Sequence, residues 1–270
     1  MSYIQALVLG IVQGLTEFLP ISSSGHLIVI PSILGWAPSG LVFDTTLHLG
    51  TAAALLVYFF KDLKNIVFGF LKDVWQHQDD FNYYSEYGKY GMYILLGSVP
   101  AGLIGFLFED KIEYVFRALR YVAIFLFLGS LLMYVSEKLS FWKLSSNVNY
   151  FKSLAIGLFQ SLALLPGFSR SGSTIAGGML FGLSREEAAR FSFLLSVPIV
   201  VLAGGYELAR AGFLITLDWL PILLVGFFAS FLTGLAAIRF LLNFLNKKGL
   251  SVFIIYRLVL IAAILLFVKM

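Results

Sequence analysis

The segment GLTEFLPISSSGHLIVI, residues 14–30, places one glutamate, three serines and one histidine between two apolar stretches. Pro20 ends the helix that the apolar residues 3–19 predict, and the serines then form a turn before the next helix. A helix over 3–19 reaches only about 25 Å, which is short of the roughly 30 Å of a bilayer core. We therefore expect a half-helix that enters the membrane and turns back, inside protein or a water-filled cavity.

The composition makes lipid the main solvent of this chain. Of 270 residues, 59% are hydrophobic and 13% are charged, whereas soluble domains carry about 25% charged residues. A soluble fold of this size could not hide so much apolar surface. The absence of cysteine excludes disulfides and thiolate chemistry. The net charge of +4 is typical of basic loops near anionic lipid, and no basic patch interleaved with aromatic residues indicates nucleic-acid binding.

Six further stretches are long and apolar enough, with their flanks, to predict membrane spans: 43–60, 91–108, 121–135, 190–208, 217–245 and 252–268. The segments between some of them are polar and are expected outside the core: 72–90, 109–120 and 136–152. No cationic segment precedes the first apolar stretch, so we expect no cleavable signal peptide. We treat residues 1–270 as one membrane domain.

The chain repeats itself. LGIVQGLTEFLPISSSGH (9–26) is similar to IGLFQSLALLPGFSRSGS (156–173), and an offset of 147 relates Gly10 to Gly157, Gln13 to Gln160, Ser22 to Ser169 and Ser24 to Ser171. Paired, interrupted apolar segments point to a site at the interface between repeats. We therefore predict an all-α, polytopic integral membrane protein with inverted repeats, about 1–145 and 146–270, and two re-entrant helical hairpins.

The two turns carry different chemistry. The first offers Glu17, and an ionisable residue in lipid is by default a functional candidate. The second, PGFSRSGST (166–174), adds Arg170 to hydroxyls at a helix start, which is typical of phosphate binding. A phosphorylated lipid suits both turns, and the expected substrate-binding residues are Ser22, Ser24, Gly25, Ser169, Ser171, Ser173 and Thr174.

Several alternatives stay open at this point. Glu17 could act as a base or ligate a divalent cation, or it could snorkel to water while the serines cap a helix. Ser23 and His26 are spaced i, i+3, which allows a nucleophile with an acid–base partner; a metal-activated water is the rival nucleophile. A transporter or flippase for an anionic polyprenyl lipid is the rival class of protein, since it suits inverted repeats equally well.

The residues Gln13 to Glu17, LPISSSGH (19–26) and PGFSRSGST (166–174) resemble the signatures of the undecaprenyl-diphosphate phosphatase family, also called the bacitracin-resistance protein. The resemblance covers essentially the whole chain, including the Tyr256–Arg257 pair. It implies hydrolysis of a C55 polyprenyl diphosphate to the monophosphate and inorganic phosphate, with a divalent cation, Mg or Ca. It also implies a multi-pass protein of the plasma membrane with a cavity that opens to the outer face.

Carried onto matching positions, the resemblance implies that Glu17 is the catalytic carboxylate or metal ligand, Ser23 the nucleophile, His26 the acid–base group and Arg170 the diphosphate clamp. Many family members carry Glu where this chain has Gln13, which cannot act as a base and is therefore assigned as a polar support.

Three features outside the turns have plainer interpretations. His48 lies one helical turn after Asp44, and the two side chains could form a second layer around the cavity or a buried pair that bonds only to itself. Arg257 is expected to snorkel to the membrane interface rather than reach phosphate. The small-residue spacing Gly226, Ser230 and Gly234 favours close helix packing. Neither this spacing nor the loop charges decide whether a homodimer forms or which side the site faces.

Overall fold

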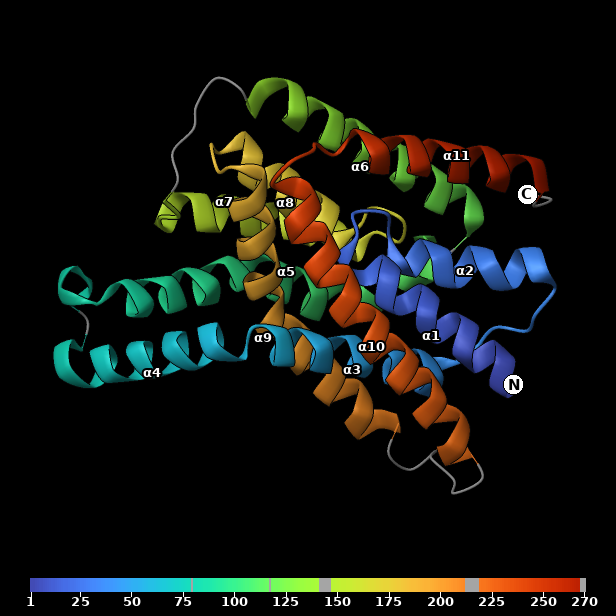
Figure 1. Cartoon of the computed structure of the whole chain (residues 1–270), viewed down its shortest axis with the longest axis horizontal. Coiled ribbons are helices and arrows are strands. Elements are labelled where there is room, and N and C mark those ends of the chain that lie inside the picture. Colours follow the sequence, from blue (N-terminus) through green and yellow to red (C-terminus); the bar gives the residue numbers. More distant parts are fainter. Residues whose placement is uncertain (79, 117, 141–146, 212–218, 268–270) are drawn as a thin grey trace.

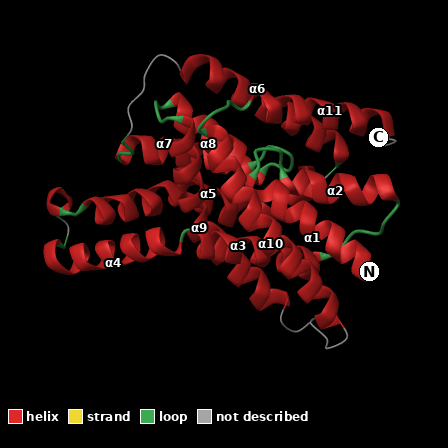
Figure 2. Cartoon of the chain, viewed as in Figure 1, coloured by secondary structure: helices red, strands yellow, loops and turns green. Residues whose placement is uncertain are grey.

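Helices are the regular secondary structure of the described residues. The computed structural model describes residues 1–78, 80–116, 118–140, 147–211 and 219–267, and over these residues it contains α-helices and short 3-10 turns but no strand (Figure 2). The first half contains α1 (Tyr3–Phe18), α2 (Ser23–Leu34), α3 (Leu41–Tyr58), α4 (Phe60–His77), η1 (Phe81–Tyr83), α5 (Glu86–Phe116) and α6 (Leu119–Leu139). The second contains α7 (Tyr150–Ser161), η3 (Leu162–Leu164), α8 (Arg170–Leu180), α9 (Arg185–Ala211), α10 (Leu220–Leu245) and α11 (Ser251–Phe267).

Five helices are long and apolar enough to cross a membrane, and they confirm five of the six expected spans: α3, α5, α6, α9 and α10. The start of the stretch predicted at 217–245 lies outside the described residues. The sixth expected span, 252–268, falls in α11, which has 17 residues and belongs with the shorter apolar helices. The other short helices include α1, with 16 residues, as the sequence predicts for 3–19, and α7, with 12 residues.

Two segments that were expected to be loops are largely helical. α4 continues to His77 and α5 begins at Glu86, so little of 72–90 is loop, and α5 extends to Phe116 into the predicted loop 109–120. Polar composition does not break α4, because one of its faces packs on α5. Asp73 on that face is buried and accepts from the Ser85 backbone N–H at 2.8 Å and the Ser85 hydroxyl at 2.6 Å, just before α5 begins.

The short helices α1 and α7 each pack mainly on a helix of the other half of the chain: α1 on α10, and α7 on α5. In Figure 1, α10 crosses the centre of the molecule, α1 runs from the N-terminus at the right and packs on α10, α6 lies beside α11, and α4 with the start of α5 extends away from both termini. Glycines permit the close approach of backbones. A Cβ on Gly14 would lie 2.5 Å from the Ser230 carbonyl oxygen, and one on Gly157 would lie 2.2 Å from the Gly97 carbonyl oxygen. The predicted packing role of the Gly226–Gly234 stripe is thereby confirmed.

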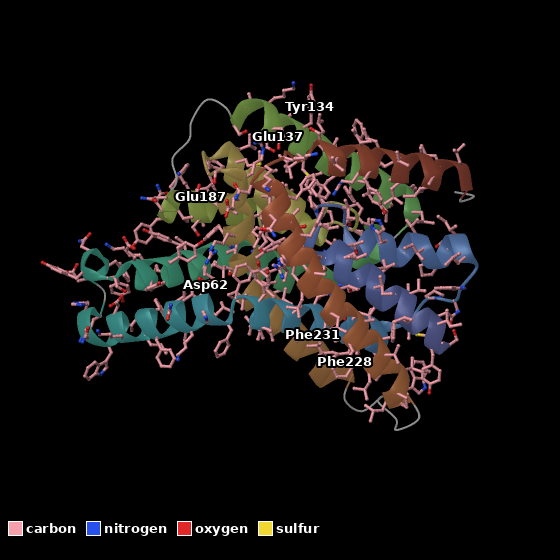
Figure 3. All side chains as sticks on the ribbon, viewed as in Figure 1. Asp62, Tyr134, Glu137, Glu187, Phe228 and Phe231 are labelled. Carbon is pink, nitrogen blue, oxygen red and sulfur yellow. The ribbon has the colours of Figure 1, made fainter. Side chains whose placement is uncertain are left out.

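Ion pairs fix the start of α9 against two other helices. Arg185 binds the Glu137 carboxylate of α6 in a bidentate manner, at 2.9 and 2.6 Å, and the Leu250 backbone N–H donates to the same carboxylate at 2.7 Å. Arg190 pairs with Asp62 of α4 at 2.6 Å. Figure 3 labels Glu137 and Asp62 on these flanking helices. The turns of α9 that follow Arg190 form part of the wall of the cavity described below, so these ion pairs also position that wall.

We expect Gly14→Ala to lower stability, because the added Cβ would lie 1.9 Å from Thr233 Oγ1 and close to the α10 backbone. Overpacking of this kind costs about 1–3 kcal/mol. Gly102→Ala is the matched control, since a Cβ on this helical glycine of α5 meets nothing within 4 Å. The thermal midpoint of the purified protein in detergent should fall for Gly14→Ala and stay level or rise for Gly102→Ala. Equal midpoints would contradict the close α1–α10 contact.

Candidate active site

The turns after α1 and α7 adopt the same unusual backbone geometry. Ser22 has φ 75° and ψ 99°, and Ser169 has φ 78° and ψ 117°, a positive-φ region that non-glycine residues seldom occupy. Each serine caps the helix that follows, because its hydroxyl accepts from the backbone N–H of Gly25 at 3.3 Å or of Gly172 at 3.1 Å. The sequence match between these serines is therefore also a structural match.

The two turns contact each other directly. The Gly167 backbone N–H donates to Ser24 Oγ at 3.4 Å, and Ser171 Oγ donates to the Leu19 carbonyl at 3.1 Å. Gly167 has φ +101°, and a Cβ there would lie 2.5 Å from the Val122 carbonyl oxygen, so this position favours glycine. Segments about 147 residues apart in the sequence thus form one unit.

Arg257 of α11 holds both turns to α6. Its side chain is fully buried, and its guanidinium donates to the carbonyls of Pro20 at 3.3 Å and Gly167 at 3.0 Å, one from each turn. It also donates to the Leu126 carbonyl at 2.9 Å and the Ser130 hydroxyl at 2.9 Å, both on α6. The expectation that Arg257 snorkels was wrong, because carbonyls exposed by the broken helices bind it in the interior.

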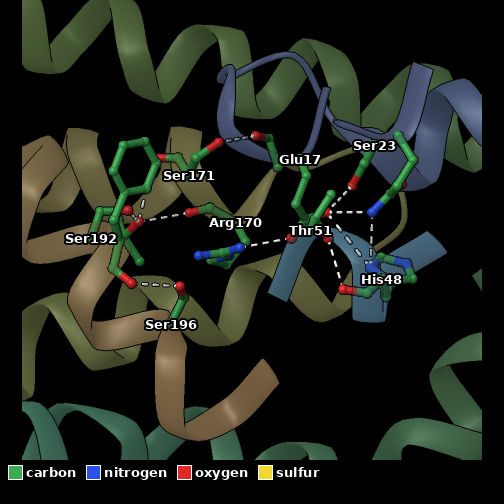
Figure 4. A network of polar contacts seen from close by, with 12 residues as sticks. Glu17, Ser23, His48, Thr51, Arg170, Ser171, Ser192 and Ser196 are labelled. Atoms are coloured by element: carbon green, nitrogen blue, oxygen red, sulfur yellow. Dashed lines mark hydrogen bonds and ion pairs between the residues drawn. The ribbon is translucent and has the colours of Figure 1, made fainter. Parts of the chain in front are cut away.

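Glu17 lies at the centre of the polar contacts (Figure 4). One carboxylate oxygen accepts from Arg170 Nη2 at 2.7 Å, and the other accepts from Ser23 Oγ at 2.7 Å. Gln13, one turn earlier on α1, donates to the second oxygen at 3.1 Å. The carboxylate therefore joins groups from both turns, and Gln13 acts as the polar support that the sequence predicts.

His48 of α3 completes this cluster. Its Nδ1 lies 3.0 Å from Gln13 Nε2 and 3.8 Å from Glu17 Oε2. Because the amide nitrogen can only donate, Nδ1 accepts and the proton of a neutral ring resides on Nε2. His48 thus belongs to the site that surrounds Glu17, as one of the two sequence interpretations proposed.

The cluster borders a cavity of about 330 Å³. Glu17, Ser23, Arg170 and His48 line part of its wall, together with Thr16, Thr45, Gln160, Ser196 and the serines Ser22, Ser24 and Ser169. The remaining wall is apolar and is formed by Ala101, Ala163, Leu164, Ile199, Val200, Ala203 and Gly204. A cavity with one polar and one apolar wall can hold an amphiphile, with its charged group at Arg170.

The structure does not place every predicted binding residue in this wall. Ser171, Ser173 and Thr174 are buried, and their hydroxyls bond protein atoms: Ser173 and Thr174 donate to the Arg170 carbonyl at 3.0 and 2.8 Å. Gly25 is buried in the first turn of α2. These residues shape the two turns, whereas Ser22, Ser24 and Ser169 border the cavity itself.

His26 also lies outside the cavity wall. Its Nδ1 donates to the Ser22 carbonyl at 2.7 Å, so Nε2 of the neutral ring accepts from the Tyr256 hydroxyl at 2.8 Å. The rings of His26 and Tyr256 stack with centroids 5.6 Å apart. The i, i+3 spacing suggested a Ser23–His26 pair, but Ser23 instead donates to Glu17, because the turn directs the two side chains differently.

Four polar residues of the cavity wall were missed from the sequence: Thr16, Thr45, Gln160 and Ser196. Gln160 had a signal, since the repeat aligns it with Gln13. The three hydroxyl residues had none, because a hydroxyl in an apolar helix usually bonds its own backbone.

The fold and site define a polytopic helical membrane protein with an acid–hydroxyl–guanidinium cluster that lines a cavity suited to a phosphorylated lipid. The family model described as bacitracin resistance protein BacA matches residues 6–264. The chain is 42% identical over 270 residues to undecaprenyl-diphosphatase from Teredinibacter turnerae, with 99% of each chain covered. It is 43% identical over 271 residues to undecaprenyl-diphosphatase from Caldicellulosiruptor bescii, covering 99% of this chain and 98% of that one. This chain belongs to the bacitracin resistance protein BacA family.

We expect Arg257→Lys to destabilise the protein, because one ammonium cannot replace a planar guanidinium that reaches carbonyls in both turns and in α6. Losing several charge-assisted hydrogen bonds should cost roughly 3 kcal/mol or more. Arg120→Lys is the control, since Arg120 is exposed and stacks on Tyr121. Thermal midpoints in detergent measure both variants. A midpoint for Arg257→Lys that matches Arg120→Lys would refute the role of Arg257.

Proposed function

We propose that this chain hydrolyses undecaprenyl diphosphate to undecaprenyl phosphate and inorganic phosphate, and so recycles the carrier lipid of cell-wall synthesis. One observation carries the assignment of the site. Glu17 bonds both Arg170 and Ser23 at 2.7 Å, beside a cavity whose remaining wall is apolar. An anion clamp, a carboxylate and a hydroxyl then meet where a lipid headgroup can enter with its chain along the apolar wall.

Arg170 is the proposed diphosphate clamp. Its Nη2 binds Glu17, whereas its Nη1 is buried without a hydrogen-bond partner. A buried, unpaired guanidinium nitrogen is costly, and a phosphate oxygen would satisfy it. The hydroxyls of Ser22, Ser24 and Ser169 border the same cavity and supply neutral donors to the other phosphate oxygens.

The Ser23–Glu17 hydrogen bond supports a nucleophilic route. Ser23 Oγ attacks the terminal phosphorus while Glu17 accepts the hydroxyl proton, and the phosphorus–oxygen bond to the lipid monophosphate breaks. Glu17 passes this proton to the departing lipid monophosphate. Water then attacks the phosphoserine while Glu17 accepts a water proton, and Glu17 returns that proton to Ser23 Oγ as inorganic phosphate leaves. In the alternative, Glu17 directs water onto the terminal phosphorus in one step.

His26 keeps its proposed acid–base role on one condition. Both of its ring nitrogens are hydrogen-bonded within the protein, so Tyr256 must release Nε2 before the ring can exchange a proton with substrate. Its bond to the Ser22 carbonyl also supports a second contribution, which is to hold the turn that carries Ser23.

A divalent cation, Mg or Ca, is a further proposal. Among the described residues, no group of three or more His, Cys, Asp or Glu side chains converges on one point. The donors nevertheless suit a cation that arrives with the diphosphate, because magnesium is often held by one carboxylate and substrate phosphates. Glu17 would hold it, and Gln13, one turn earlier on the same helix face, has a buried amide oxygen, Oε1, without a hydrogen-bond partner. Such a cation would neutralise charge on the phosphates.

We also propose the finer architecture. The matched turns, the short α1 and α7, and the packing of each on the opposite half support inverted repeats with two re-entrant hairpins.

The protein would reside in the plasma membrane with its cavity open to the outer side. Lysines occur on α4, at the end of α6 and at the start of α7 (Figure 1). They support a cytoplasmic position for the end of the molecule that these segments form. A homodimer interface would have to form on a surface other than the α10 glycine stripe, because α1 already packs on that stripe.

We predict that the detergent-purified protein with Mg or Ca releases phosphate from undecaprenyl diphosphate, and that Glu17→Gln, His26→Ala and Arg170→Ala each lose most of this activity. Loss of a general base typically costs 10²- to 10⁴-fold. Phosphate release is measured directly, with the abundance of folded protein checked by gel filtration. Detergent removes sidedness, so a parent protein that releases no phosphate would favour the lipid transporter. Full activity in Arg170→Ala would show that the clamp is misassigned.

Ser23→Ala should separate the two nucleophiles. If the serine is phosphorylated, turnover falls at least about 10³-fold and the parent yields an acid-stable labelled protein from ³²P-labelled substrate. If water attacks directly, Ser23→Ala loses only the hydrogen bond to Glu17 and retains measurable turnover, and no label is found. We expect the first outcome, because the Ser23 hydroxyl already donates to Glu17 at 2.7 Å.

A further inference from the structure

Gln160 is a buried polar side chain without a partner. Only 3% of the residue is exposed, and neither its amide nitrogen nor its amide oxygen forms a hydrogen bond. A buried amide normally finds a partner, because leaving one unpaired sacrifices its hydration without return. Gln160 nevertheless lines the same cavity as Glu17 and Arg170. The unsatisfied amide therefore lies at the wall where a ligand would be held.

The repeat shows why this glutamine is free. In the first short helix, Gln13 donates to Glu17 at 3.1 Å and to His48 at 3.0 Å. In the second, Gln160 holds the matching position on α7, but Leu164 stands where the offset of 147 places Glu17. The second helix thus keeps the amide and lacks the carboxylate that would occupy it.

Two side chains with unused donors consequently border one cavity. Arg170 Nη1 is also buried without a partner, while Nη2 is held by Glu17. A guanidinium and a neutral amide together suit a phosphoryl oxygen, since the arginine supplies charge and the amide supplies a directed N–H. Ala163 and Leu164, which follow Gln160 in the sequence, line the same cavity, so the amide has both polar and apolar neighbours in its wall.

We infer that the Gln160 amide donates a hydrogen bond to a phosphoryl oxygen of the bound lipid diphosphate, as a binding residue beside Arg170. The inference rests on the proposed function and adds a residue from α7 to a polar cluster otherwise built from α1, the two turns and α3. Since the amide atoms are covered in this arrangement, a small rotation of the side chain towards the cavity accompanies binding. The amide oxygen remains available for a water or a protonated phosphate oxygen.

The test compares Gln160→Leu and Gln160→Glu with the parent. Leucine has a similar volume and removes no existing hydrogen bond, so the thermal midpoint should stay level or rise. Because a hydrogen bond to a charged group is lost, kcat/KM on undecaprenyl diphosphate should fall roughly tenfold to a hundredfold. Glutamate keeps the shape but opposes the phosphate charge and should lose more. Ser161→Ala is the matched control, since Ser161 is the next residue on α7 and bonds the Gly157 carbonyl at 3.3 Å.

Inhibition constants identify which phosphate is bound. Weaker inhibition of Gln160→Leu by inorganic phosphate assigns the amide to the terminal phosphoryl group, and weaker inhibition by undecaprenyl phosphate assigns it to the lipid-linked one. If neither inhibition constant changes, or if Gln160→Leu keeps kcat/KM within twofold of the parent, the inference is overturned. It is also overturned if activity and thermal midpoint fall together, because the amide would then be structural. A parent without hydrolysis would instead defeat the proposed function.

Discussion

The whole site depends on satisfying the backbone where two helices break inside the protein. The ends of α1 and α7 leave carbonyls that no helix continues to pair, and Arg257 binds carbonyls in both turns and in α6 from a fully buried position. A buried guanidinium is expensive unless its donors are paired, so the interaction stabilises only when both turns and α6 are correctly placed. Arg257 therefore couples the position of each turn to that of the other.

The polar contacts use this fixed geometry. With the turns bonded to each other through Ser24 and Ser171, Glu17 reaches Arg170 across the interface between them. The ion pair satisfies two charges that would otherwise be unpaired in an apolar protein. Under the proposed function, a diphosphate bound at the free Nη1 of Arg170 would share that guanidinium with Glu17.

The sequence revealed much of the fold and the centre of the site, and it failed for identifiable reasons. Glu17, Ser23 and Arg170 could be found because charged and polar groups within an apolar segment are costly and persist mainly where they serve a function. Hydropathy could not show that α4 continues to His77, since a helix packed on one face tolerates charges on the other. Spacing could not place His26 or Arg257 either. Tertiary packing brings them to their partners, Tyr256 and the carbonyls of both turns, and neither residue spacing nor composition predicts that packing.

The two turns show how one backbone can acquire two functions. Ser22 and Ser169 share the same positive φ and the same capping bond, so the scaffold is equivalent at both positions. The side chains that follow differ: Ser23 stands where the second turn has Arg170, and His26 where it has Ser173. The first turn thereby carries the nucleophile candidate and its carboxylate, and the second carries the cation. Dividing these groups between facing turns lets Glu17 contact both Ser23 and Arg170 at 2.7 Å while all three line one cavity.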